Sequence, residues 1–394
     1  MIKIKTEVDR VKLGEYFTAL KVKTNLVNNE TREFMIYPGE AYLTIGVKGI
    51  DKNDIKVWVN PDDTINWECL DINYPDNNDN LIRSVYYTGN DLSFIKWSKS
   101  RKIGFSWHPL KAADIDLTNS KIDTLRIITD DKITIKFGPN QKEFTYTGNP
   151  ANLIIKDWGN VYWFWINISN EKISTTYELP NWGHIKNLKK VTIDTNPNGA
   201  ALDCCSIEQF KGIEELSLLG NLTNLENLNE FTDLKELGFW NVPNLSGLPP
   251  IAIFKDLTYF CAKDIEKERG TILRKEVNKL KKTKEFRHIY VGGLRDELWF
   301  KTEYGIPFTD WENDYGKKAM RIYKECLATV KKSQTEEELK QAIESYTMKM
   351  NKLKDIETVE REDIYTALCT IMENTKVKID YNTWFNWFDN LREF

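Results

Sequence analysis

The sequence Leu188-Lys-Lys-Val191-Thr-Ile193 opens a short pattern that the chain repeats three more times. The pattern is apolar-x-x-apolar-x-apolar, and it returns in Ile213-Glu-Glu-Leu216-Ser-Leu218, Leu234-Lys-Glu-Leu237-Gly-Phe239 and Leu257-Thr-Tyr-Phe260-Cys-Ala262. The starts at residues 188, 213, 234 and 257 lie 25, 21 and 23 residues apart. A unit of this length cannot bury its apolar positions alone, so the repetition predicts units that stack side by side.

Each repeat predicts a strand with an inward and an outward side. Because successive side chains of a strand alternate, positions four and six of the pattern are expected in the core, and positions three, five and seven outside. The outward strip has an apolar and aromatic centre with acids and lysines around it, which is typical of a protein interface. The alternative is that the chain's own N- or C-terminal domain covers the strip. The predicted partner-binding residues are Lys190, Thr192, Asp194, Glu215, Ser217, Leu219, Glu236, Trp240, Tyr259, Lys263, His288 and Tyr290.

The middle of the chain resembles the leucine-rich repeat family, with four good units between residues 188 and 263. The resemblance implies a solenoid whose stacked strands leave one open face for macromolecules. Regular members carry an asparagine at the ninth position of each unit, and here only Asn196 and Asn221 occupy it. We therefore expect a short, irregular leucine-rich repeat solenoid over residues 113–310.

The segments on either side of the repeats have a different character. Residues 1–112 contain alternating stretches such as Ala41–Val47 and Ile55–Val59, which predict a β-rich N-terminal region. Residues 311–394 contain apolar stripes at helical spacing, and Thr335-Glu-Glu-Glu338 is a capping box that predicts the start of a helix. The expected fold class is α+β: a β-rich N-terminal region, a short solenoid and a C-terminal helical bundle.

The helical tail carries a second resemblance. Its segments 356–364 and 384–394 are similar to the tail of certain bacterial proteins with divergent leucine-rich repeats. Some of those proteins are encoded beside polymorphic toxins and act as immunity proteins that bind and block the toxin. The resemblance implies a protein partner, with a toxin encoded nearby as its most concrete form.

Composition narrows the classes of function. The chain has 394 residues, and its net charge of −4 lacks the basic excess of a dedicated nucleic-acid binder. The sequence has no run of about 18 apolar residues, so it predicts no membrane span. The N-terminus has no apolar core of a secretory signal, and the six scattered cysteines fit reduced thiols. A cytoplasmic protein without membrane or nucleic-acid partners is expected.

Few residues form a pattern that would carry chemistry. The histidines His108, His184 and His288 are far apart in sequence and lie in no metal-binding frame. The vicinal pair Cys204-Cys205 has no C-x-x-C or Cys/His frame. The acidic run Glu357–Asp363 fits the first turn of a helix, where carboxylates complement the helix dipole. The sequence therefore predicts no catalysis, no cofactor and no metal site.

An aromatic block at Tyr162-Trp163-Phe164-Trp165 has two interpretations. Alternation places Phe164 inward, and Trp163 and Trp165 on the other side of the strand. Either the strand is buried on both faces, between the solenoid and the N-terminal domain, or the two tryptophans form an exposed patch for a partner.

These observations favour a non-catalytic protein-binding module. Its most concrete form is an immunity protein that occludes a bacterial toxin, with Trp240 and Tyr259 as anchors and Glu215 and Glu236 facing basic groups of the partner. The alternative is a regulatory or scaffold leucine-rich repeat protein that binds a cellular partner. The sequence does not predict an oligomeric state.

Overall fold

The structure is a computed structural model. The chain divides into two compact units, Met1–Phe300 and Lys301–Phe394. The structure describes residues 6–13, 17–51, 55–74, 80–168, 175–183, 185–297, 299–300, 308, 311, 314–354 and 356–394.

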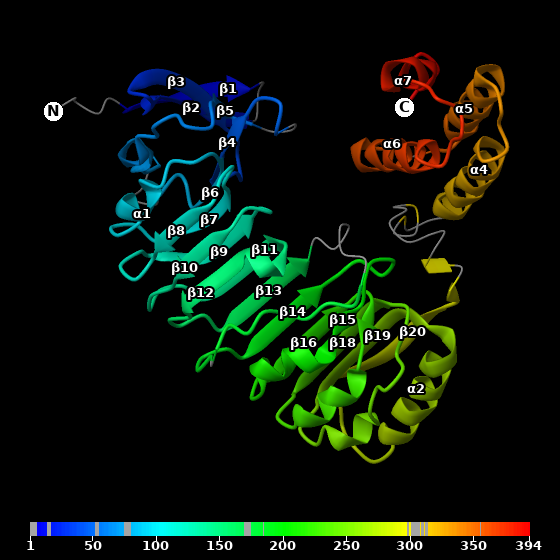
Figure 1. Cartoon of the computed structure of the whole chain (residues 1–394). Helices are drawn as coiled ribbons and strands as arrows, with labels where there is room; N and C mark the ends of the chain where they lie inside the picture. The colour runs from blue at the N-terminus through cyan, green and yellow to red at the C-terminus, as the bar shows by residue number, and fades with distance from the viewer. Residues whose placement is uncertain are drawn as a thin grey trace. The chain divides into compact units, whose positions relative to one another are not determined.

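A 12-stranded sheet runs through the first unit (Figure 1). All neighbouring strands in it are parallel, and apart from the edge strand β5 they follow one another in chain order. Parallel neighbours require crossover connections, and right-handed crossovers between strands that follow one another in one direction lie on the same face of the sheet. The strands are β4 (Tyr42–Val47), β5 (Val57–Val59), β6 (Ser84–Thr88), β7 (Ile103–His108), β9 (Ile122–Ile128), β11 (Glu143–Gly148), β13 (Trp163–Ile168), β14 (Lys190–Asp194), β16 (Glu215–Leu219), β18 (Glu236–Val242), β19 (Tyr259–Glu266) and β20 (His288–Arg295).

The connections build a second layer of short elements. A three-stranded parallel sheet and a two-stranded one lie in it, together with 3-10 and α-helices. The helix α2 (Lys267–Leu280) forms in the charged segment that follows the fourth repeat. The elements of this layer are β8 (Ala113–Asp116), β10 (Ile133–Lys136), β12 (Leu153–Asp157), β15 (Leu202–Asp203), β17 (Leu222–Thr223), η1 (Trp67–Leu70), α1 (Phe94–Trp97), η2 (Pro150–Asn152), η3 (Cys204–Phe210), η4 (Leu225–Glu230), η5 (Ile251–Ile253) and α2.

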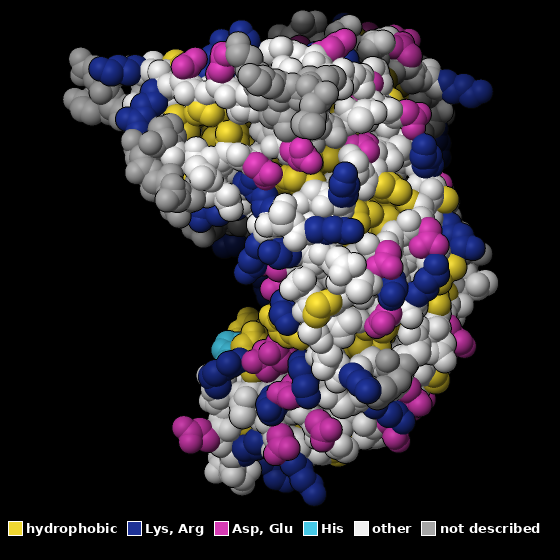
Figure 2. Space-filling model, turned by 90° about the vertical axis from the view of Figure 1, so that its left-hand side faces the viewer, with side chains coloured by type: hydrophobic (Ala, Val, Ile, Leu, Met, Phe, Trp, Pro, Cys, Tyr) yellow, Lys and Arg dark blue, Asp and Glu magenta, His cyan; other side chains and the backbone are white. Residues whose placement is uncertain are grey.

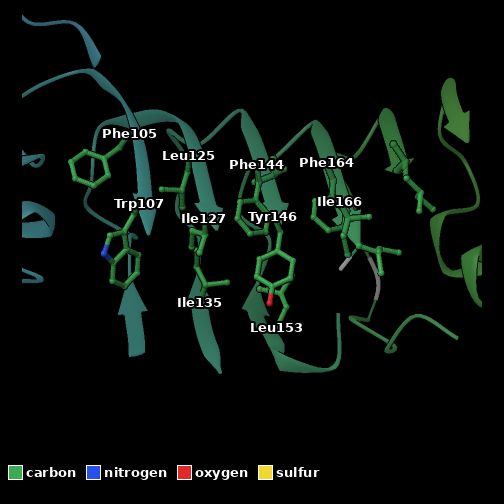
Figure 3. Close-up of a cluster of buried hydrophobic side chains, with 14 of the residues drawn as sticks. Phe105, Trp107, Leu125, Ile127, Ile135, Phe144, Tyr146, Leu153, Phe164 and Ile166 are labelled. Carbon is green, nitrogen blue, oxygen red and sulfur yellow. The ribbon is translucent and has the colours of Figure 1, made fainter. Parts of the chain in front are cut away.

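The core of this unit lies between the two layers, where equivalent side chains of successive strands form ladders. Figure 3 shows Leu125, Phe144 and Phe164 side by side on three neighbouring strands, above Ile135 and Leu153 of the second layer. Phe144 and Phe164 stack with ring centroids 5.5 Å apart and an interplanar angle of 11°. Burial of one such side chain stabilises the fold by about 1.5–3 kcal/mol.

Two glycines let the chain turn closely around the strand ends. Gly148 and Gly220 have φ angles of 152° and 91°. A Cβ atom on Gly148 would lie 1.9 Å from the carbonyl oxygen of Thr129, and one on Gly220 would lie 1.8 Å from that of Thr195. Only glycine fits both the backbone conformation and the approach of the neighbouring chain segment.

An antiparallel three-stranded sheet precedes the large sheet. Its strands are β1 (Thr6–Leu13), β2 (Phe17–Val27) and β3 (Glu30–Ile36). Val22, Leu26 and Phe34 are buried and belong to the same hydrophobic core as the large sheet. This small sheet therefore extends the core of the first unit.

The expected fold class is wrong, and the large sheet is the finding that overturns it. The chain is an α/β protein with a 12-stranded parallel sheet flanked by helices, instead of an α+β protein with a β-rich region followed by a short leucine-rich repeat solenoid. The sheet crosses residue 112 without interruption, because β7 pairs in parallel with β9. Phe105 and Trp107 of β7 lie in register with Leu125 and Ile127 of β9, so the strands are continuous although their side chains differ in type.

Within its described residues the second unit has four helices: α4 (Asp314–Val330), α5 (Glu336–Met350), α6 (Thr358–Met372) and α7 (Tyr381–Asp389). The capping box at the start of α5 is present, with the Thr335 hydroxyl accepting a hydrogen bond from the backbone N–H of Glu338. Ile343 of α5, Ile364 of α6 and Phe388 of α7 are buried in one hydrophobic core. Packing of these apolar stripes stabilises short helices that would be marginal in isolation.

Candidate functional site: the outward face of β13–β20

The outward side chains of the last six strands form a regular surface, which we call the outward face. Strand pairing in register places them in three rows that run across the strands. The first row is Trp163, Lys190, Glu215, Glu236, Tyr259 and His288. The second row is Trp165, Thr192, Ser217, Gly238, Cys261 and Tyr290. The third row is Asn167, Asp194, Leu219, Trp240, Lys263 and Gly292.

All twelve residues predicted from the repeats lie on this face. Thr192 is buried, with 9% of its surface exposed, and so offers little surface to a partner, whereas Lys263, His288 and Tyr290 are exposed. The other eight predicted residues are half-buried. The N-terminal region continues the sheet beyond β9 and so does not cover these rows.

The aromatic block of β13 belongs to the same face. Phe164 is completely buried, whereas Trp165 is 37% exposed, so the strand is not buried on both sides. Trp163 and Trp165 stack with an interplanar angle of 8° and ring centroids 6.4 Å apart. They add a rigid aromatic surface at one end of the face.

Both acids of the first row already have cationic partners within the chain. Glu215 forms an ion pair with Lys190 at 3.0 Å, and the Lys190 ammonium lies 4.5 Å from the ring centroid of Trp163. Glu236 accepts a hydrogen bond of 2.5 Å from the Arg287 guanidinium. The expectation that Glu215 and Glu236 meet basic groups of a partner is therefore weakened, because both carboxylates are neutralised internally.

Arg287 is a residue of the site that sequence reasoning missed. It precedes β20 and also lies over the ring of Tyr259, 5.4 Å from its centroid. Tyr259 in turn stacks on His288 at 4.8 Å. Burial raises the pKa of the Tyr259 hydroxyl. The alternation of side chains within a strand does not predict a role for Arg287, because its contacts with Glu236 and Tyr259 depend on which strands lie next to β20.

Glycines in two rows make room for aromatic rings to lie on the sheet. A Cβ atom on Gly238 would lie 2.0 Å from the Trp240 ring, and one on Gly292 would lie 2.0 Å from the Tyr290 hydroxyl. Trp240 and Tyr290 therefore lie against the backbone of their own strands. A ring held in this way loses little conformational entropy on binding, which suits an interface anchor.

Asp194 differs from the other acids of the face. Within the described residues its carboxylate makes no hydrogen bond or ion pair, and its neighbours in the third row are Asn167 and Leu219. Burial raises the pKa of this carboxyl group. A partly desolvated, unpaired carboxylate destabilises the free protein.

The remaining candidates for chemistry have structural explanations. Asp203, the N-cap of η3, accepts a hydrogen bond from the backbone N–H of Cys205 and also raises the pKa of the Cys205 thiol. Glu357 and Glu360 form a capping box at the start of α6. His184 lies outside the described residues. Where the chain is described, no group of three or more His, Cys, Asp or Glu side chains has the arrangement of a metal site.

Charge on the visible surface is mixed. Figure 2 shows Lys and Arg side chains interspersed with Asp and Glu, and hydrophobic side chains between them. This distribution differs from the continuous basic stripe of a typical nucleic-acid-binding surface. In the described part of the chain, no helix has the length and apolar character needed to cross a membrane.

Comparisons with models of known protein families, with curated proteins and with solved structures found no match to this chain. The case for a function therefore comes from the geometry of the outward face.

Proposed function

We propose that this chain is a non-catalytic protein-binding module that uses the outward face of β13–β20. The observation that carries the proposal is the arrangement of this face. Leu219 on β16, Trp240 on β18 and Tyr290 on β20 offer apolar surface, while charged side chains surround them. Large rigid side chains within a polar rim are the usual composition of an interface hot spot.

The most concrete form of the proposal is an immunity protein that occludes a bacterial toxin. The similarity of the helical tail to such proteins supports this form, as does an interface that needs no chemistry of its own. The six cysteines are free thiols, which supports a reducing cytoplasmic location. A regulatory or scaffold protein with another cellular partner would use the same face.

The size of the face sets a requirement on the partner. Six strands at a spacing of about 4.8 Å span roughly 24 Å, and three rows extend roughly 13 Å along the strands. The projected area is therefore about 300 Å², which is a lower bound on the accessible surface that the protruding side chains can bury. A stable interface buries roughly 800 Å² of accessible surface per partner, and contacts with β9 and β11 or the strand ends would add to that of the three rows.

The test is an affinity purification of the full chain from its native cells, with the protein encoded next to it co-expressed. The proposal expects a stoichiometric complex with that neighbour and loss of its toxicity. Trp240→Ala should weaken the complex by about 2 kcal/mol, or roughly 30-fold, if Trp240 is an anchor. The matched control is Tyr86→Ala, which removes an exposed aromatic side chain from β6 of the same sheet.

The outcomes separate the possible functions. Unchanged binding by Trp240→Ala in a variant that folds normally would reject the outward face as the interface. A stable complex with a different protein would favour the regulatory or scaffold function. A chain that protects cells without forming a complex would contradict a binding mechanism.

A further inference from the structure

The third row of the outward face has an order of side chains that the first row lacks. Across neighbouring strands it runs Asp194, Leu219, Trp240 and Lys263. An acid and a base thus stand at the two ends of an apolar pair. Three strand spacings separate them, which corresponds to about 14 Å.

Both end groups lack an ionic partner within the described residues. The other charged side chains of the face are Lys190, Glu215 and Glu236, and each is paired: Lys190 with Glu215, and Glu236 with Arg287. Asp194 and Lys263 are too far apart across Leu219 and Trp240 to pair with each other. The charged side chains of the first row are therefore paired within the chain, whereas Asp194 and Lys263 of the third row have no ionic partner among the described residues.

The two free charges differ in what they contribute to the isolated protein. Lys263 is exposed, so water solvates its ammonium group. Asp194 is half-buried among uncharged neighbours, and a leucine or asparagine at its position would remove an unfavourable charge. A destabilising group on a surface is typical of a site where stability is given up for function.

We propose that the third row is a recognition strip for a partner protein whose own segment lies across the strands and carries a cation and an anion about 14 Å apart. An Arg or Lys of that segment would pair with Asp194, apolar side chains would contact Leu219 and Trp240, and an Asp or Glu would pair with Lys263. This inference rests on the proposed function and adds the charge order and direction of the bound segment. Complementary charges at fixed positions set register and exclude wrong partners.

The first experiment needs no partner. Asp194→Asn removes the charge and keeps the shape, and urea unfolding of the full chain at pH 7 should show a higher midpoint than for the natural protein. Glu215→Gln is the matched control, because Glu215 lies on the next strand and already forms an ion pair with Lys190. The midpoint of this variant should equal that of the natural protein or be lower. A lower midpoint for Asp194→Asn would mean that the fold itself uses this carboxylate, and it would overturn the inference.

The second experiment uses the purified protein encoded next to this chain as the probe. Asp194→Asn and Lys263→Gln should each weaken binding by about tenfold or more and reduce its salt dependence, whereas Glu215→Gln should have little effect. If Trp240→Ala weakens binding but both charge variants bind normally, the proposed function stands and the recognition strip is wrong. If the probe binds none of the proteins, natural chain included, the immunity form of the proposed function fails and the inference falls with it.

Discussion

Replacing two adjacent residues of β13 tests whether the outward face is free. Phe164→Ala removes a completely buried ring that lies within 5.1–5.6 Å of the rings of Phe144, Trp158 and Trp182. The cavity and the lost burial cost about 3–5 kcal/mol, and each aromatic pair adds about 0.5–1.5 kcal/mol. We expect a loss of about 5 kcal/mol, near the upper end of the range for such substitutions.

The neighbouring residue provides the comparison. Trp165 is 37% exposed and stacks on one ring, that of Trp163. Trp165→Ala should therefore cost about 1 kcal/mol. Equilibrium urea unfolding followed by circular dichroism measures both losses, and similar slopes with urea would show that the variants unfold over the same surface.

The comparison has a clear contrary result. If Trp165→Ala costs as much as Phe164→Ala, β13 is buried on both faces and no partner can reach the outward face. If Phe164→Ala costs less than about 1 kcal/mol, the ring ladder does not form the core. Either result would refute the assignment of sides on which the binding proposal depends.

Three further predictions concern backbone, capping and pH. Gly220→Ala should cost more than about 2 kcal/mol of stability, because its Cβ would overlap a carbonyl oxygen. Gly212 has a similar φ of 88° but no atom within 4 Å of the added Cβ, so Gly212→Ala should cost only about 1 kcal/mol. Equal losses of stability in thermal unfolding would contradict this prediction. Thr335→Ala should lower the stability of the helical unit by about 1 kcal/mol, and Thr335→Ser should restore most of it in the same assay. The raised pKa of Asp194 means that its protonated form favours the folded state. The natural chain should therefore lose stability relative to Asp194→Asn as pH rises above the ordinary value of 3.8 and through the folded pKa, and the difference should level off at higher pH. A difference that does not change with pH would refute this cause.

Local patterns in the sequence predicted much of the candidate site. The alternation around Val191 and Ile193 assigned their neighbours Lys190, Thr192 and Asp194 to the opposite side of the strand, and the structure places them there. Alternation is a property of the extended backbone, so it can be recognised in a few residues without knowledge of the fold. The capping box at Thr335 could also be recognised from four consecutive residues, because its hydrogen bonds form within one turn of the helix.

The sequence did not predict the extent of the sheet. The early strands hold Tyr87, Phe105 and Trp107 at inward positions, whereas β16 holds Leu216 and Leu218, and these large aromatic residues made the early strands look unlike the repeats. Backbone hydrogen bonds join parallel strands whatever apolar side chains they carry. The strands from β4 to β20 consequently form one sheet, although their sequences look different.

By itself, the sequence determined which side chains leave each strand on the outward side, because that choice depends only on the period of the backbone. The tertiary structure alone decided which of them meet. Glu236 pairs with Arg287, 51 residues away, because β18, β19 and β20 lie next to one another in register. The same register leaves Asp194 between Asn167 and Leu219 with no cation beside it among the described residues. Charge pairing between strands depends on the order of the strands in the sheet and on their register, and both are set by the packing of the whole sheet.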